Sequence, residues 1–119
     1  MSKSLLIVDD DELVSAGVAM ALEDSGFRVT IIDRGRPVPD LVAVAPPDAV
    51  LLDVSLPDIN GVEVARALRS RWPDLPIVFT TGHDADAGVR EMLAQNRTSM
   101  LQKPFAIQDL LTIIGEITR

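Results

Sequence analysis

Short runs of apolar residues alternate along this chain with longer segments in which apolar residues recur at helical spacing. The runs are too short for ordinary helices and are typical of buried strands, whereas the longer segments are typical of amphipathic helices. The pattern predicts five strands, at residues 4–8, 27–32, 49–53, 75–80 and 99–102, and five helices, at about 12–25, 37–44, 62–71, 85–95 and 107–117. Such alternation indicates a parallel sheet with right-handed crossovers and helices on both faces.

The predicted fold is therefore α/β: a doubly wound, five-stranded parallel sheet of strand order 2-1-3-4-5 between two helical layers. A chain of 119 residues can bury one sizeable core, and no repeat or linker divides it, so we expect a single domain over residues 1–119. The absence of cysteine excludes disulfides and thiolate metal sites.

The charge and the hydropathy of the chain limit the classes of partner that it is expected to bind. The formal net charge is −7, which disfavours direct binding to nucleic acid or to an anionic membrane, since both need clustered Lys and Arg. No apolar run approaches membrane-spanning length, and the amino terminus has no signal-type pattern. A cytoplasmic location is the default expectation.

Asp53 ends the most apolar of the predicted strands. Pro57 and Gly61 follow in a loop that leads to the next helix. Reactive groups in open α/β sheets lie in the crevice beyond the carboxyl ends of the strands, where this order of elements places Asp53. The alternative is that Asp53 only caps a turn.

Four predicted strand ends carry complementary groups, namely Asp9 with Asp10, Asp53, Thr81 and Lys103. Carboxylates this close need protons, a lysine or a metal, and oxygen ligands without His or Cys suit Mg²⁺. Asp53 is then a candidate nucleophile, while Lys103 and Thr81 are candidate donors to phosphoryl oxygens.

Each of these residues also has a structural interpretation. Asp11 and Glu12 are better explained as the start of the first helix, where negative charge is favourable. Thr81 alone is compatible with an ordinary strand residue and Lys103 with a surface loop. His83, the only histidine, is interpreted as a loop residue near the site.

Four motifs in this order and spacing resemble the receiver domain of two-component response regulators, over essentially the whole chain. They are Leu6–Asp11, Leu51–Asp53 with Leu56, Pro57 and Gly61, Phe79–Gly82, and Lys103–Phe105. The resemblance implies the flavodoxin-like, three-layer receiver fold, with Asp53 as phosphoacceptor and Mg²⁺ as cofactor.

The resemblance also implies individual roles. Asp10 corresponds to a direct Mg²⁺ ligand, Asp9 to a ligand acting mainly through water, and Ser55 to the residue whose backbone carbonyl binds the metal. Thr81 and Lys103 correspond to the pair that contacts the phosphoryl group. Lys103–Pro104 corresponds to the usual cis peptide of the family.

The function implied is a signalling module rather than a metabolic enzyme. Such a domain takes a phosphoryl group from the phosphohistidine of a histidine kinase or histidine phosphotransfer domain and loses it by Mg²⁺-assisted hydrolysis. Its fourth helix, fifth strand and fifth helix then change, so that an effector protein or a second copy binds through the last helices. Because the sequence ends soon after the last helix, we expect either a stand-alone receiver or part of a hybrid kinase or larger regulator.

The sequence departs from the family pattern in two features. Met100 stands where an aromatic switch residue is usual, and Asn96–Arg97 replace a small pair. Methionine repacks readily but offers no hydroxyl. These departures leave open a second hypothesis, a degenerate receiver that serves as a docking or dimerisation scaffold.

Two enzymatic alternatives are disfavoured by specific residues. A Mg²⁺-dependent phosphatase that uses Asp53 generally needs a second carboxylate two residues later, where this chain has Ser55. A dinucleotide site lacks its glycine-rich fingerprint after the first strand, where Asp9–Asp11 repel a pyrophosphate.

Overall fold

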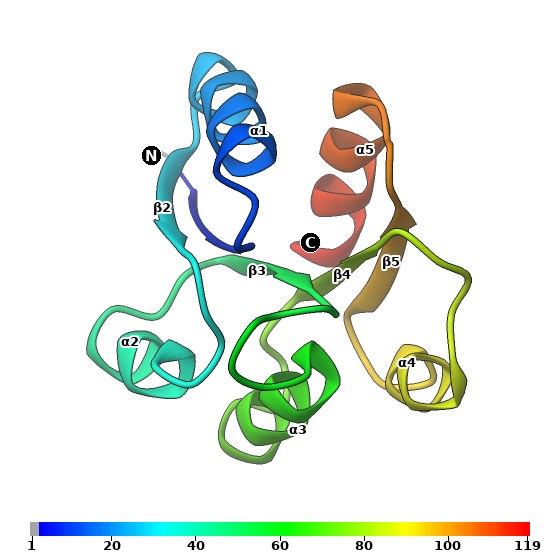
Figure 1. Ribbon diagram of the computed structural model, residues 1–119. Coiled ribbons are helices and arrows are strands. Elements are labelled where there is room, and N and C mark those ends of the chain that lie inside the picture. The colour runs from blue at the N-terminus through cyan, green and yellow to red at the C-terminus, as the bar shows by residue number, and fades with distance from the viewer. Residues whose placement is uncertain (1–2) are drawn as a thin grey trace.

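Five parallel strands form one sheet in the order β2-β1-β3-β4-β5, which confirms the predicted doubly wound α/β fold (Figure 1). The computed structural model describes residues 3–119. The strands are β1 (Ser4–Val8), β2 (Arg28–Ile32), β3 (Ala49–Asp53), β4 (Ile77–Thr81) and β5 (Thr98–Gln102). The helices are α1 (Glu12–Asp24), α2 (Val38–Val44), α3 (Gly61–Arg71), α4 (Ala87–Leu93) and α5 (Ile107–Ile117).

Helices cover both faces of the sheet, with α1 and α5 on one side and α2, α3 and α4 on the other (Figure 1). Successive residues of a strand point to opposite faces, so each strand contributes to two cores. In β1, Leu6 and Val8 pack with α2, α3 and α4, whereas Leu5 and Ile7 pack with α1 and α5.

The degree of burial follows the position of each strand in the sheet. Every residue of β3 and of β4 is buried, as expected for central strands covered on both faces. Neither edge strand, β2 or β5, contains a buried residue. Residues 27–32 alternate and are rich in β-branched side chains, which predicts a strand nearer the edge, and the structure confirms this prediction.

Strand and helix boundaries differ from prediction around β4 and α4. β4 begins at Ile77 rather than Leu75, because Leu75 still belongs to the preceding turn and donates its backbone N–H to the carbonyl of Trp72 at 3.2 Å. Helix α4 begins later than the predicted residue 85 because Asp86 caps it, accepting from the N–H of Val89 at 2.9 Å, and it ends at Leu93 rather than at residue 95.

The sequence predicts left-handed backbone at Gly26 and at Asn96, each of which directly follows a predicted helix. Gly26 has φ 97° and confirms the first prediction. The second was wrong by one residue, since Arg97 has φ 51°. Asn96 instead uses its side-chain amide to donate to Asp74 Oδ1 at 2.9 Å.

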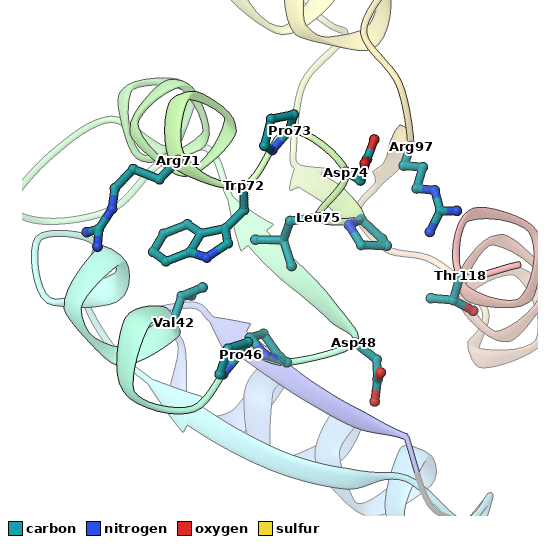
Figure 2. Close-up of a pocket in the computed structure, with 12 residues that line it drawn as sticks. Val42, Pro46, Asp48, Arg71, Trp72, Pro73, Asp74, Leu75, Arg97 and Thr118 are labelled. Atoms are coloured by element: carbon teal, nitrogen blue, oxygen red, sulfur yellow. The ribbon is translucent and has the colours of Figure 1, made fainter.

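The edge of the sheet at the amino-terminal ends of the strands has a hollow lined by Trp72 (Figure 2). Its charged groups already have partners: the guanidinium of Arg71 lies 4.5 Å from the centre of the Trp72 ring, and Asp48 accepts from the backbone N–H of Ser4 at 2.6 Å. The candidate chemistry lies at the opposite edge. Within residues 3–119, none of the helices is long and apolar enough to span a membrane.

Candidate functional site

Three carboxylates meet at the carboxyl end of the sheet. β1 and β3 are neighbours, and their register pairs Val8 with Leu52, so the chain brings Asp9 next to Asp53 as it leaves the strands. One ligand oxygen from each of Asp9, Asp10 and Asp53 lies within 4.8 Å of the others. Asp9 and Asp53 are only 5% and 6% exposed, whereas Asp10 is exposed and leaves the cluster open on one side.

Lys103 supplies the positive charge of the cluster. Its Nζ donates to Asp9 Oδ2 at 2.9 Å and to Asp53 Oδ2 at 3.3 Å. Its own backbone N–H donates to the carbonyl of Thr81 at 2.7 Å, which fixes where the side chain leaves the end of β5. The Lys103–Pro104 peptide is cis, as the resemblance implied.

Burial and neighbouring charges shift the pKa values of Asp53 and Lys103. Burial raises the pKa of Asp53, the charge of Lys103 opposes this effect, and the charge of Asp9 adds to it. Burial alone would lower the pKa of Lys103, but its hydrogen bonds and ion pairs with Asp9 and Asp53 outweigh burial and raise it. The lysine is therefore charged at neutral pH and partly compensates a pair of buried acids.

Gly61 allows the loop after β3 to close tightly. The Gly61 N–H donates to the carbonyl of Val54 at 2.8 Å, and a Cβ at position 61 would lie 2.2 Å from the carbonyl oxygen of Asp53. Asn60 then caps α3 by accepting from the N–H of Val62 at 2.8 Å. Inside the loop, the Ser55 N–H donates to Asp53 Oδ1 at 3.2 Å, which links the loop to the carboxylate.

Thr81 is buried at the end of β4, at the same edge of the sheet. Its Oγ1 accepts from the backbone N–H of His83 at 3.2 Å. His83 is an exposed loop residue, as predicted. The prediction for Asp11 is also confirmed, because its carboxylate accepts from the N–H groups of Leu13 and Val14 and caps α1.

One contact of the loop between β3 and α3 was not predicted from the sequence. Asp58 accepts from the backbone N–H groups of Gly35 and Arg36, each at 2.8 Å, and so joins the β3–α3 loop to the β2–α2 loop. The only signal in the sequence was an acidic residue directly after Pro57. Nothing in that pattern pointed to residues more than twenty positions earlier in the chain.

The donor set fits a hard divalent cation. It consists of carboxylate oxygens on one open side of the sheet, with no sulfur ligand, and Mg²⁺ prefers oxygen ligands and keeps several waters. Asp9, Asp10 and Asp53 are the side chains that would hold such an ion.

Met100 lies at the position predicted to carry the switch residue. It is paired with Phe79 across β4 and β5, is partly buried, and packs against the core that α3 and α4 share. The nearby Arg97 side chain donates through Nη2 to the carbonyl of Arg119 at 2.9 Å, so it folds back towards the end of the chain.

Comparison with known proteins identifies one matching family and several similar proteins. The family model of the response regulator receiver domain matches residues 5–115. Response regulator MprA of Mycolicibacterium vanbaalenii is 38% identical over 119 residues, which is all of this chain and 52% of that protein. MprA of Mycobacterium tuberculosis is 35% identical over the same share of each chain. The chain thus spans about half the length of these curated relatives.

Solved structures share the fold along nearly the whole chain. A CheY-like response regulator receiver domain from Methanospirillum hungatei has a TM-score of 0.91 at 25% identity, covering 99% of this chain and 94% of that one. The BeF3-activated receiver domain of Klebsiella pneumoniae RstA has a TM-score of 0.87 at 29% identity, covering 98% of each chain. Together with the family match and the acidic cluster beside Lys103, these likenesses show that the chain belongs to the response regulator receiver domains of two-component signalling.

Proposed function

We propose that this receiver domain accepts a phosphoryl group on Asp53, with Mg²⁺ bound by Asp9, Asp10, Asp53 and the backbone carbonyl of Ser55. The observation that carries the proposal is the cluster of three carboxylates within 4.8 Å, two of which share the ammonium group of Lys103. A carboxylate at the end of a buried strand, facing a cation, is suited to nucleophilic attack on phosphorus.

The reaction transfers one phosphoryl group between two nucleophiles. An Asp53 carboxylate oxygen attacks the phosphorus of a phosphohistidine; the O–P bond forms, the N–P bond breaks, and the histidine nitrogen keeps the electron pair. Lys103 then moves from its partners Asp9 and Asp53 to a phosphoryl oxygen, and the Thr81 hydroxyl donates to another. A bound Mg²⁺ neutralises charge that develops on the phosphoryl oxygens.

An apolar groove beside the site supports a protein as the phosphoryl donor. It begins at Lys103 and lies between α1 and the segment that leads from β5 into α5. Leu13 on its rim is 88% exposed and extends the apolar surface of the groove. The groove is lined by Leu13, Val14, Gly17, Val18, Lys103, Pro104, Phe105 and Ile107. We therefore propose a histidine kinase or histidine phosphotransfer domain as the donor.

The proposed output is a change in the surface of α4, β5 and α5, through which an effector or a second copy binds. Movement of Thr81 towards the phosphoryl group frees space on the α4 side of the sheet, where Met100 repacks. The net charge of −7 argues against direct nucleic-acid binding by this segment, and we propose a cytoplasmic setting.

Intact-mass measurement after incubation with acetyl phosphate, with and without Mg²⁺, tests the proposal. We expect one phosphoryl adduct that depends on Mg²⁺, that disappears in Asp53→Ala, and that loses its Mg²⁺ dependence in Asp10→Ala. Asp40→Ala, which removes an exposed carboxylate on α2, is the matched control and should label like the wild type. Undiminished labelling of Asp53→Ala would contradict the assignment. A folded wild type that binds Mg²⁺ but forms no adduct would instead favour the docking scaffold, or a receiver that accepts phosphate only from its own kinase.

A further inference from the structure

The loop between β3 and α3 presents Ser55 to the acidic cluster, so its conformation determines the geometry there. The base of the loop is closed by the hydrogen bond from the Gly61 N–H to the Val54 carbonyl at 2.8 Å. Within the loop, the Ser55 N–H also donates to Asp53 Oδ1 at 3.2 Å. A displacement of the loop would therefore move both the Ser55 backbone and the Asp53 carboxylate.

Asp58 holds the outer part of this loop. Its Oδ1 accepts from the Gly35 N–H and its Oδ2 from the Arg36 N–H, each at 2.8 Å, while its carbonyl accepts from Arg36 Nη2 at 3.5 Å. Within residues 3–119, these and the Ser55–Asp53 hydrogen bond are the only hydrogen bonds that join residues 55–59 to earlier parts of the chain. The Gly35 N–H in particular lowers the pKa of Asp58, so the side chain is a carboxylate at neutral pH.

Close packing accompanies these hydrogen bonds. Gly35 is buried, and a Cβ there would lie 2.7 Å from side-chain carbons of both Ile59 and Val64 and 3.0 Å from Leu56. Any side chain at position 35 would push the β2–α2 loop away from the β3–α3 loop. The glycine therefore lets both backbone N–H groups reach the Asp58 carboxylate.

We propose that Asp58 is a positioning residue for the Mg²⁺ site, acting through its contact with the backbone of Gly35 and Arg36. This inference rests on the proposed function, since it concerns the same metal. Asp58 touches none of the three clustered carboxylates; it fixes the loop from which Ser55 and Asp53 are aligned. The β2–α2 loop, which is remote from the acidic cluster in sequence, thereby becomes a determinant of metal affinity.

Mg²⁺ titration by calorimetry tests the proposal with a binding constant rather than an activity. Loss of groups that orient metal ligands typically weakens binding about 10- to 100-fold, so we expect Asp58→Ala to raise the Kd at least about tenfold. Asp58→Asn keeps one acceptor oxygen and should lie between Asp58→Ala and the wild type. Asp40→Asn makes the same change of charge on the neighbouring helix α2 and should keep the wild-type Kd. Gly35→Ala disturbs the contact from its other side and should weaken binding as Asp58→Ala does.

Amide hydrogen exchange at residues 35 and 36 shows whether the contact has been lost. Faster exchange there in Asp58→Ala, together with a Mg²⁺ Kd equal to that of Asp40→Asn, would overturn the positioning role. All titrations are made well below the melting temperature of each variant, so that a loss of global stability does not change the Kd. If Asp58→Ala does not fold, Asp58→Asn and Gly35→Ala decide the matter. A folded wild type that binds no Mg²⁺ would refute the proposed function and the positioning role together, whereas an altered Kd only in the control would refute the positioning role alone.

Discussion

Replacement of Gly61 by alanine should lower both the stability and the rate of phosphoryl transfer. The start of α3 can lie next to the end of β3 because residue 61 has no side chain. The added Cβ would lie 2.2 Å from the Asp53 carbonyl oxygen and 2.9 Å from the Val54 Cα. Ordinary non-bonded contacts are longer by roughly 1 Å. Both sides are held by hydrogen bonds, Gly61 to the Val54 carbonyl and the Val54 N–H to the Thr80 carbonyl at 3.0 Å, so neither moves freely.

The expected loss of folding stability has two contributions. Overpacking of a buried position costs about 1–3 kcal/mol, and a weakened buried hydrogen bond adds about 1 kcal/mol. For a domain of 119 residues, a total of about 2–4 kcal/mol lowers the melting temperature by roughly 8–16 °C. A shift of roughly 1 Å in the backbone of Asp53, the proposed phosphoacceptor, should also slow acyl phosphate formation about a hundredfold.

Thermal unfolding by circular dichroism and the rate of labelling by acetyl phosphate measure the two effects separately. Gly115→Ala is the matched control, since a Cβ at this exposed position of α5 meets no atom within 4 Å. It should gain about 0.8–1 kcal/mol from the higher helix propensity of alanine, with no change in labelling. A Gly61→Ala variant that melts and labels like the wild type would show that the loop after β3 accommodates a Cβ at position 61.

Three further changes test the electrostatics and the local structure of the site. Asp53 has a raised pKa, so its stabilising contribution is complete below the ordinary aspartate value of 3.8 and is lost as pH rises through the folded-state pKa. Metal-free Asp53→Asn should therefore have a higher melting temperature than the wild type at pH 7 but not at pH 3. Equal melting temperatures at pH 7 would argue against a crowded acidic site. Lys103→Met leaves the buried carboxylates of Asp9 and Asp53 without their cation, so the free energy of unfolding in urea should fall by about 3 kcal/mol, and by less with saturating Mg²⁺. An equal loss of stability with and without Mg²⁺ would contradict the compensating role of the lysine. Asn60→Ala removes the α3 cap and should cost about 1 kcal/mol in the same measurement, whereas an unchanged urea midpoint would mean that the cap contributes nothing.

The fold and the clustered acids were predictable because both depend on periodic patterns. Central strands buried on both faces leave continuous apolar runs, and parallel strands bring the residues after them to one edge. Asp9 and Asp53 could thus be placed together from their positions alone. The charge of Lys103 was expected there, but its bridging of both carboxylates depends on side-chain geometry that no pattern encodes.

The missed features are those decided by contacts between distant residues. The apolar run into β4 includes Leu75 and Pro76, although the strand begins only at Ile77. The left-handed residue is Arg97 rather than Asn96, because the backbone entering β5 overrides the local preference for asparagine. Asp58 meets its partners across the space between two loops, and an isolated carboxylate after a proline gives no indication of them.

β5 is one of the two edge strands at which the sheet is expected to open locally. β5 pairs with β4 alone and has no buried residue, whereas β3 and β4 are buried throughout. Segments with few buried contacts unfold locally at free energies well below the roughly 5–15 kcal/mol of global unfolding. The buried strand β3, which carries Asp53, should therefore open at a higher free energy than the edge strand β5, and Lys103 stands directly after β5. A charge added at Asp53 can redistribute the conformers of β5 for a small share of the total stability, while the strands that hold the carboxylates stay in place.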